Sequence, residues 1–323
     1  MELFNYKKPI KLMAKSKYFA MLSLVLVLSS WVLLFTKGFD YGIDFAGGTL
    51  IQVKYEHKAP ITKIREDLKA NPLYKNANVT FFGGPNEVVI RTKSSPNSVQ
   101  KDIGEEVSKL LKNSGKLEIR RVDIVGASIG AEFREKGIMA MLLSIISILI
   151  YVSMRFEWRF ALASVLALVH DVSIAIGAII LFHIEVNLDI LAALLTLLGY
   201  SLNDTIIVFD RIREGIREIK NPDLVSIIDE SVTRTLSRTV LTSLTTFFVV
   251  LSLYLFGGEI INGFSFTLLV GIIVGTYSSI FVASPILMWL RFDVKGFRGR
   301  EAAKRKREKE KEKVRAMYEQ GTI

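Results

Sequence analysis

The stretch LLGYSLNDTIIVFDR, residues 197–211, places one carboxylate, Asp204, inside an apolar segment. On the helical period of about 3.6 residues, several polar side chains gather on or beside one side of this segment, namely Tyr200, Asp204, Arg211, Thr196 and Asn203. A charged side chain at the centre of a bilayer costs roughly 2.5–3.5 kcal/mol on insertion scales, so such residues normally face a bundle interior or a water-filled path. Asp204 therefore either handles ions or protons within the membrane, or marks a helix end that reaches water.

The composition indicates a membrane protein, because half of the 323 residues are hydrophobic and they lie in long blocks. The absence of cysteine excludes disulfides, thiolate metal sites and a cysteine nucleophile. The only histidines, His57, His170 and His183, do not have the spacing of metal ligands, which disfavours a zinc enzyme. We therefore predict no metal and no cofactor.

The net charge of +10 lies at the two ends of the chain. Residues 1–17 hold five Lys and one Glu, and residues 291–323 hold twelve Lys or Arg and six acids. Basic tails can bind nucleic acid, but clusters beside membrane helices favour cytoplasmic anchoring at membrane lipids. We therefore expect lipids rather than nucleic acid as partners of these ends. The part of the tail beyond Arg300 is expected to be a solvated helix or disordered.

Residues 18–36 form an uncharged run of nineteen residues, long enough to cross a hydrocarbon core of about 30 Å. The run exceeds the apolar region of a signal peptide and lacks a small-x-small cleavage site, so we interpret it as an uncleaved first transmembrane helix. Five further apolar segments follow at residues 137–154, 160–181, 186–209, 239–258 and 263–290. The sequence thus predicts a polytopic α-helical membrane protein with six transmembrane helices.

Between the first two helices, residues 37–136 alternate in the manner of a small α+β domain. The expected order is strand, helix, strand, strand, helix, strand, with the strands at residues 49–56, 78–82, 87–92 and 117–124 and the helices starting near Pro60 and at residues 95–98. This order is the split βαβ, ferredoxin-like plan. We find no catalytic constellation in this domain.

Lys and Arg are confined to alternate links between the helices, around Arg155 and across residues 211–238. The positive-inside rule then places both termini and these links in the cytoplasm and residues 37–136 on the far side. Within the link 212–236, apolar residues at helical spacing favour short amphipathic helices along the inner interface over an ordinary solvated link; they are Ile212, Ile216, Ile219, Leu224, Ile227 and Ile228.

Two strips of small residues predict close helix packing. One contains Asp171 together with Ala163, Ala167 and Ala175, so this carboxylate is expected to face inward. The other consists of Gly271, Gly275, Ser279 and Ala283. We interpret the second strip as structural.

The fifth helix opens with a polar line formed by Arg238, Thr242 and Thr245. These hydroxyls could conduct water or could bond their own backbone. The guanidinium of Arg238 should seek a carboxylate, and Asp204 is the candidate at similar depth. A nearby positive charge favours the ionised acid and burial disfavours it, so a small change in hydration or distance could make Asp204 take up or release a proton.

Four motifs together resemble the SecF family: GIDFAGG at residues 42–48, VHD at 169–171, SLNDTIIVFDR at 201–211 and SRT at 237–239. This family is the smaller half of the SecDF protein-export accessory complex, within the resistance-nodulation-division superfamily. The resemblance extends from the first to the sixth helix. No single motif is specific by itself, but their conjunction in this order is.

The resemblance implies a subunit of the bacterial inner membrane with residues 37–136 in the periplasm. The implied partners are SecD, the SecYEG translocon, YajC and the translocating unfolded polypeptide. The implied activity is the use of the proton gradient to draw polypeptide across the membrane, with protons as the coupling ion. Asp204 matches the family's proton-linked Asp and Arg238 its essential Arg, while Asp171, Tyr200, Asn203 and Thr242 are given supporting roles. The larger periplasmic head of the SecD half is missing here, so we do not expect transport by this chain alone.

Three other functions compete with protein export: a passive scaffold, a small-molecule exporter and an intramembrane protease. A passive assembly scaffold would use its buried polar residues only to orient helices, and it should tolerate Asp204→Asn. A small-molecule exporter of the same superfamily is disfavoured by the modest soluble domain and the single set of six helices. An intramembrane protease lacks the paired aspartates or the Ser/His pair that its chemistry needs, so we predict that the chain is not an enzyme.

Overall fold

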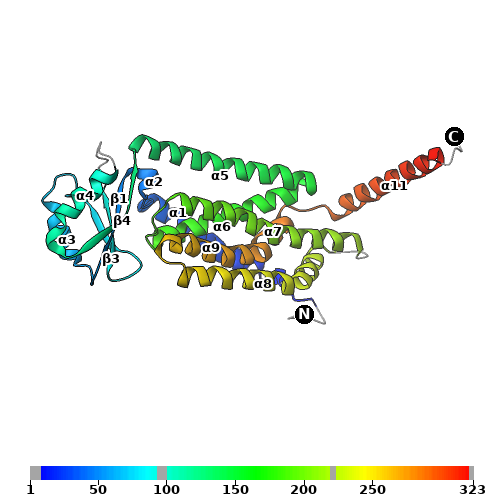
Figure 1. The fold of residues 1–323 in the computed structure, drawn as a ribbon. Coiled ribbons are helices and arrows are strands. Elements are labelled where there is room, and N and C mark those ends of the chain that lie inside the picture. The colour runs from blue at the N-terminus through cyan, green and yellow to red at the C-terminus, as the bar shows by residue number, and fades with distance from the viewer. Residues whose placement is uncertain (1–8, 93–99, 219–222, 320–323) are drawn as a thin grey trace.

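The computed structural model describes residues 9–92, 100–218 and 223–319. Within these ranges six helical segments are long and apolar enough to cross a membrane: α1 (Ser16–Thr36), α5 (Ala127–Arg155), α6 (Trp158–Leu181), α7 (Leu188–Glu218), α8 (Leu224–Phe256), and α9 (Glu259–Ser278) continued by a π-helical turn (Ser279–Ala283) and α10 (Ser284–Trp289). The predicted architecture of six transmembrane helices is therefore confirmed. The soluble domain caps one end of this bundle, and the first described residues and the C-terminal helix lie at the other (Figure 1).

The soluble domain contains β1 (Gly48–Tyr55), α3 (Ile61–Lys69), β2 (Asn78–Phe81), β3 (Glu87–Thr92), α4 (Gln100–Leu110), a short 3-10 helix (Lys112–Ser114) and β4 (Leu117–Val125). All neighbouring strands are antiparallel, in the order β2-β3-β1-β4. This is the predicted ferredoxin-like plan. The two helices cover the sheet with buried apolar side chains, as Ile64 of α3 and Ile103 of α4 pack with Ile51 and Ile90 of the strands.

A short helix that the sequence did not predict, α2 (Ile43–Ala46), connects α1 to β1 and packs on the start of α5. Gly47 ends it with φ +72°, a backbone conformation that favours glycine. A Cβ on Gly47 would lie 2.7 Å from Ala127 Cα, and one on Gly130 would lie 2.8 Å from Gly47 N. Because α5 begins at Ala127, the membrane helix starts ten residues before the predicted segment at 137. The soluble domain is thus attached to α5 through a close backbone contact, the Gly47–Gly130 contact.

The link between α7 and α8 differs from our expectation of short interfacial helices over residues 212–236. Helix α7 continues to Glu218 and α8 already begins at Leu224. Ile212, Ile216 and Ile227 are fully buried in the core of the bundle, so the apolar residues face the helices rather than the lipid surface. Ile219 lies outside the described residues.

The C-terminal tail forms α11 (Val294–Glu319). Near the N-terminal end of the chain, a 3-10 helix (Met13–Lys15) leads into α1. Helix α11 projects away from the bundle (Figure 1). Its charged side chains are mostly exposed, as a solvated helix requires.

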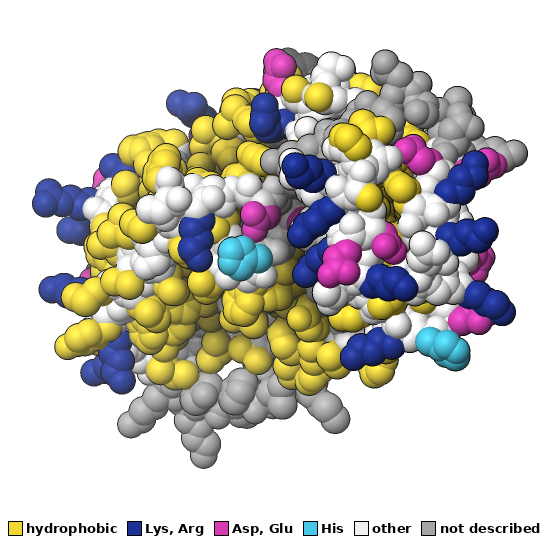
Figure 2. All heavy atoms as spheres, turned by 90° about the vertical axis from the view of Figure 1, so that its left-hand side faces the viewer, with side chains coloured by type: hydrophobic (Ala, Val, Ile, Leu, Met, Phe, Trp, Pro, Cys, Tyr) yellow, Lys and Arg dark blue, Asp and Glu magenta, His cyan; other side chains and the backbone are white. Residues whose placement is uncertain are grey.

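The surface divides by polarity. Viewed from the end that carries the soluble domain, charged side chains gather over that domain, whereas hydrophobic side chains dominate the bundle beside it (Figure 2). Of the most apolar windows of α1 and α5, only 11% of residues are buried. Side chains such as Leu22 and Leu142 are therefore available to lipid or to partner helices.

Candidate functional site

Asp204 lies on α7 where this helix meets α8 and α9. Its residue is 2% exposed, and Oδ2 accepts a hydrogen bond from Ser243 Oγ of α8 at 3.2 Å. Ser243 Oγ in turn lies 2.7 Å from Thr276 Oγ1 of α9. Asp204 is therefore almost fully buried and accepts from one side-chain donor, Ser243, which itself contacts the hydroxyl of Thr276.

Asp171 on α6 forms a second buried network. The residue is fully buried, and its carboxylate accepts from Ser278 Oγ at 2.7 Å and from Ser201 Oγ. His170 Nδ1 lies 2.8 Å from its other oxygen, Oδ1. The small residues on its strip, Ala163, Ala167 and Ala175, are also fully buried. The inward orientation predicted for Asp171 is therefore found in the structure.

The strip of small residues on α9 lets that helix approach α7 closely. A Cβ on Gly271 would lie 2.5 Å from Leu197 Cδ1, and one on Gly275 would lie 3.1 Å from Ser201 Cβ. This approach brings the hydroxyls of α9 within reach of both networks. Ser201 donates to Asp171 and lies one helical turn from Asp204 on α7, so the networks of the two buried carboxylates adjoin along this helix.

Arg238 does not pair with Asp204, contrary to our expectation. Its side chain is exposed and makes no ion pair or hydrogen bond with any residue that the structure describes. The next residue, Thr239, is 1% exposed and faces the bundle. A helix turns about 100° per residue, so Arg238 points away from the interior.

The three remaining residues that were given supporting roles do not contact Asp204 within the described part of the chain. Tyr200 packs with the apolar side chains between α8 and α9, and its buried hydroxyl has no partner there. Asn203 is exposed. Thr242 is exposed and donates to the backbone oxygens of Arg238 and Thr239, both at 3.0 Å. The hydroxyl of Thr242 thus bonds its own helix.

Sequence reasoning missed the hydroxyls that hold the two carboxylates, above all Ser243. A signal was present, because Thr235, Thr239 and Ser243 recur every four residues and all three are buried. This is the same spacing that identified the strips of small residues on α6 and α9. The predicted polar line of Arg238, Thr242 and Thr245 lies on the exposed side of α8.

The GIDFAGG motif positions α7 as well as the soluble domain. Asp44 Oδ2 accepts from Leu188 N at 3.1 Å, at the N-terminus of α7. A carboxylate there satisfies a free backbone donor and complements the helix dipole. The motif therefore fixes one end of the helix that carries Asp204.

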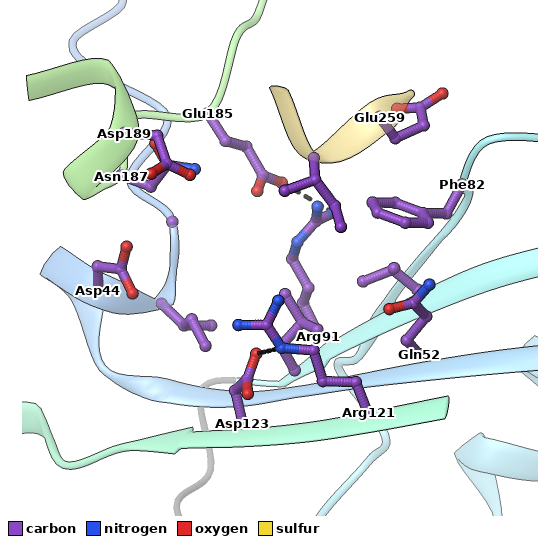
Figure 3. A pocket seen from close by; sticks show the side chains of 15 residues that line it. Asp44, Gln52, Phe82, Arg91, Arg121, Asp123, Glu185, Asn187, Asp189 and Glu259 are labelled. Atoms are coloured by element: carbon purple, nitrogen blue, oxygen red, sulfur yellow. Dashed lines mark ion pairs between the residues drawn. The ribbon is translucent and has the colours of Figure 1, made fainter. Parts of the chain in front are cut away.

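A pocket of about 170 Å³ lies between the soluble domain and the bundle (Figure 3). Within it Arg91 of β3 pairs with Glu185 of the α6–α7 link at 3.0 Å, and Arg121 of β4 pairs with Asp123 at 2.6 Å. Burial raises the pKa of Glu185, and the hydrogen bond from Arg121 to Asp123 raises the pKa of Arg121. No group of three possible metal ligands occurs within the described ranges.

Comparison with known proteins agrees with the motifs. Residues 106–293 match the family model "Protein export membrane protein SecD/SecF, C-terminal", and residues 32–59 match "SecD/SecF GG Motif". Protein translocase subunit SecF of Helicobacter pylori (strain J99) is 48% identical over 323 residues, which is all of both chains. The same subunit of Vibrio alginolyticus is 45% identical over 291 residues, covering 90% of this chain and 92% of that protein.

The fold is also similar to a solved structure. The crystal structure of SecDF from Thermus thermophilus, a translocon-associated membrane protein, superposes with a TM-score of 0.81 at 35% identity. The match covers 90% of this chain but 40% of that one. By its sequence relatives and by its fold, this chain belongs to the SecF family of protein translocase subunits.

Proposed function

We propose that this chain is an accessory subunit of the bacterial Sec translocase that works with SecD to couple the proton gradient to polypeptide translocation across the inner membrane. Asp204 carries the proposal. It is a carboxylate of 2% exposure in a helix that can span a membrane, and a single hydroxyl donates to it. Protons are the only coupling ion that the proposal needs.

The physical basis is the balance of forces on this carboxylate. An ionised carboxylate can accept about four hydrogen bonds, whereas Asp204 accepts one from a described side chain, so its ionised form has few donors. Arg238 on α8 carries the positive charge that would favour the ionised form if it came close. A rearrangement that brings Arg238 closer would release the proton, and one that separates them would bind it. The gradient supplies about 2.3 kcal/mol per charge per 100 mV for such a cycle.

The exposed polar residues on the membrane helices support a partner. Asn203, Arg238 and Thr242 face outward from a bundle whose surface is mainly apolar, where lipid would leave them poorly solvated. Helices of SecD would cover them. This chain matches 40% of the Thermus SecDF chain, and the unmatched remainder of that chain is long enough to include a SecD half. SecYEG, YajC and the unfolded polypeptide follow as further partners. The basic ends support both termini in the cytoplasm and the soluble domain in the periplasm.

Replacement of Asp204 by Asn in cells that depend on this subunit tests the proposal. The variant should copurify with SecD as the parent does, because Asn keeps the volume and the hydrogen bond to Ser243, while exported precursors accumulate in the cytoplasm. A passive scaffold would assemble and export at the parent's rate, and that result would reject proton coupling through Asp204.

A further inference from the structure

His170 is a buried histidine whose second ring nitrogen has no partner. The residue is 6% exposed, and Nδ1 lies 2.8 Å from Asp171 Oδ1. Nε2 is buried without a hydrogen bond to any described residue. The ring stacks on Tyr277 of α9 with centroids 6.2 Å apart and planes at 25°. A buried polar atom left unpaired in this way is uncommon in proteins.

The contact with Asp171 fixes the chemistry of the ring. Asp171 also receives the hydroxyls of Ser201 and Ser278, so the carboxylate, when ionised, can accept from these two groups and from His170 Nδ1. Nδ1 then carries the hydrogen that points at Asp171, and Nε2 of a neutral ring is a free lone pair. One proton added at Nε2 gives an imidazolium against a carboxylate and changes the net charge of the pair from −1 to zero.

We propose that His170 and Asp171 form a second proton-binding site of this subunit, which takes up one proton at His170 Nε2. The inference rests on the proposed proton coupling and adds a protonatable group to it. His170 is the group that binds the proton, and Asp171 orients the ring and balances its charge.

The surroundings contain little else that could balance that charge. On α9 the only titratable side chain facing the ring is Tyr277, whose hydroxyl donates to Phe19 O of α1. The segments of α1 and α5 that cross the bundle, residues 18–36 and 137–154, hold no charged residue, and neither do residues 279–289. On α7 the nearest acid is Asp204, one turn beyond Ser201. The charge of the pair therefore depends mainly on its own proton.

Helix α9 connects this site to Asp204. Ser278 donates to Asp171, while Thr276 lies 2.7 Å from the hydroxyl that Asp204 accepts. A π-helical turn begins at Ser279, directly after these residues, and such turns are frequent at functional sites. A small shift of α9 would move the Ser278 donor of Asp171 together with Thr276, which contacts the Ser243 donor of Asp204. Protonation at one site is thereby linked to the other.

The variant His170→Asn separates proton binding from a structural role. The Asn amide nitrogen takes the position of Nδ1 and still donates to Asp171, while Nε2 is removed. We expect the variant to fold and to bind SecD, and export driven by an imposed pH difference to fall by about ten-fold or more. Export at the parent's rate over the whole pH range would overturn the proposal.

Nitrogen-15 NMR of the histidine ring in lipid bilayers reads the proton directly. The chain has only three histidines, so a His57→Gln, His183→Gln double variant, labelled at histidine and assembled with unlabelled SecD, reports His170 alone. Both replaced residues are exposed. We expect Nε2 to gain a proton as the pH of the sample is lowered. A constant state of Nε2 would overturn the proposal, and this result does not depend on whether Asp204 couples to export.

Discussion

Ser243 Oγ of α8 donates a hydrogen bond to Asp204 Oδ2 of α7 across 3.2 Å, so a serine, and not Arg238, is the side chain that contacts the buried acid. The hydroxyl lies between the carboxylate and Thr276 of α9, 2.7 Å away. Three helices thus converge on one carboxylate through hydroxyl groups. This arrangement can exchange a proton without separating a strong ion pair first.

Removing that hydroxyl should slow export without dismantling the bundle. Ser243→Ala deletes a hydrogen bond to a charged group, worth about 1.5–3 kcal/mol, so export driven by a pH difference should fall by about ten-fold or more. The matched control is Thr242→Ala on the same helix, because Thr242 is exposed and bonds only its own backbone. The rates can be compared in vesicles. Equal rates for the two variants would show that Ser243 does not act through Asp204.

Loss of the Arg238 guanidinium should affect export and leave stability intact. Because Arg238 makes no ion pair within the described chain, Arg238→Met should change the free energy of unfolding by no more than about 0.5 kcal/mol. Export should fall strongly, since the charge that favours ionised Asp204 is gone. Arg234→Met is the control: Arg234 is exposed and pairs with Glu230 on the same helix. A large fall in melting temperature for Arg238→Met would indicate a structural role instead.

The Gly47–Gly130 contact should tolerate no side chain. A Cβ at Gly47 would lie 2.7 Å from a backbone atom of α5, and its φ of +72° adds backbone strain. Gly47→Ala should therefore destabilise the protein by about 1–3 kcal/mol, measured by thermal unfolding in detergent. Gly299→Ala on α11 meets no atom within 4 Å and should be neutral. Similar melting temperatures for the two variants would contradict the close contact.

The pocket under the soluble domain should make stability depend on pH. Burial raises the pKa of Glu185 above its ordinary value of 4.5, and the Arg91 charge opposes that rise. The folded protein then holds this proton more tightly than the unfolded chain does. Glu185 therefore makes its full contribution to the free energy of unfolding below about pH 4.5. That contribution is lost as the pH rises through the raised pKa of Glu185 in the folded protein.

Arg91→Met should raise the pKa of Glu185 further, so thermal stability should fall over a wider pH range than in the parent. Glu185→Gln should remove this part of the pH dependence. Arg120→Met serves as a control, because Arg120 pairs with Glu118 on the exposed side of β4. Melting temperatures measured from about pH 4 to pH 8 decide the matter. If the dependence of melting temperature on pH were unchanged in Arg91→Met, the Arg91 charge would not be lowering the pKa of Glu185.

The fold was largely predictable because its signals are local. Uncharged runs gave the membrane helices, and alternation in stretches such as residues 49–56 gave the strands. The four-residue helix α2 escaped because it is shorter than any periodic signal and is held by contacts with α5. The apolar spacing over residues 212–236 was real, but periodicity does not say whether an apolar stripe meets lipid or, as for Ile212, neighbouring helices.

The site was predictable in part. A carboxylate in an apolar helix stands out in any sequence, so Asp204 and Asp171 were found. Their donors were not, because a serine such as Ser243 or Ser278 is unremarkable until tertiary contacts show which residues meet. The predicted pairing of Arg238 with Asp204 rested only on their similar depth in the membrane. Depth gives the position of a residue along the helix axis, but it does not say toward which neighbour the side chain points. The structure supplies that direction.

The most direct test of the account is translocation driven by an imposed pH difference in vesicles that contain the complete complex, with Asp204→Asn compared with Asp210→Asn. The two substitutions are the same change on the same helix, but Asp210 pairs with Arg155 at the surface. We predict that Asp204→Asn assembles and abolishes the response to the pH difference, while Asp210→Asn keeps it. A full response from Asp204→Asn would contradict the claim that this carboxylate carries the coupled proton.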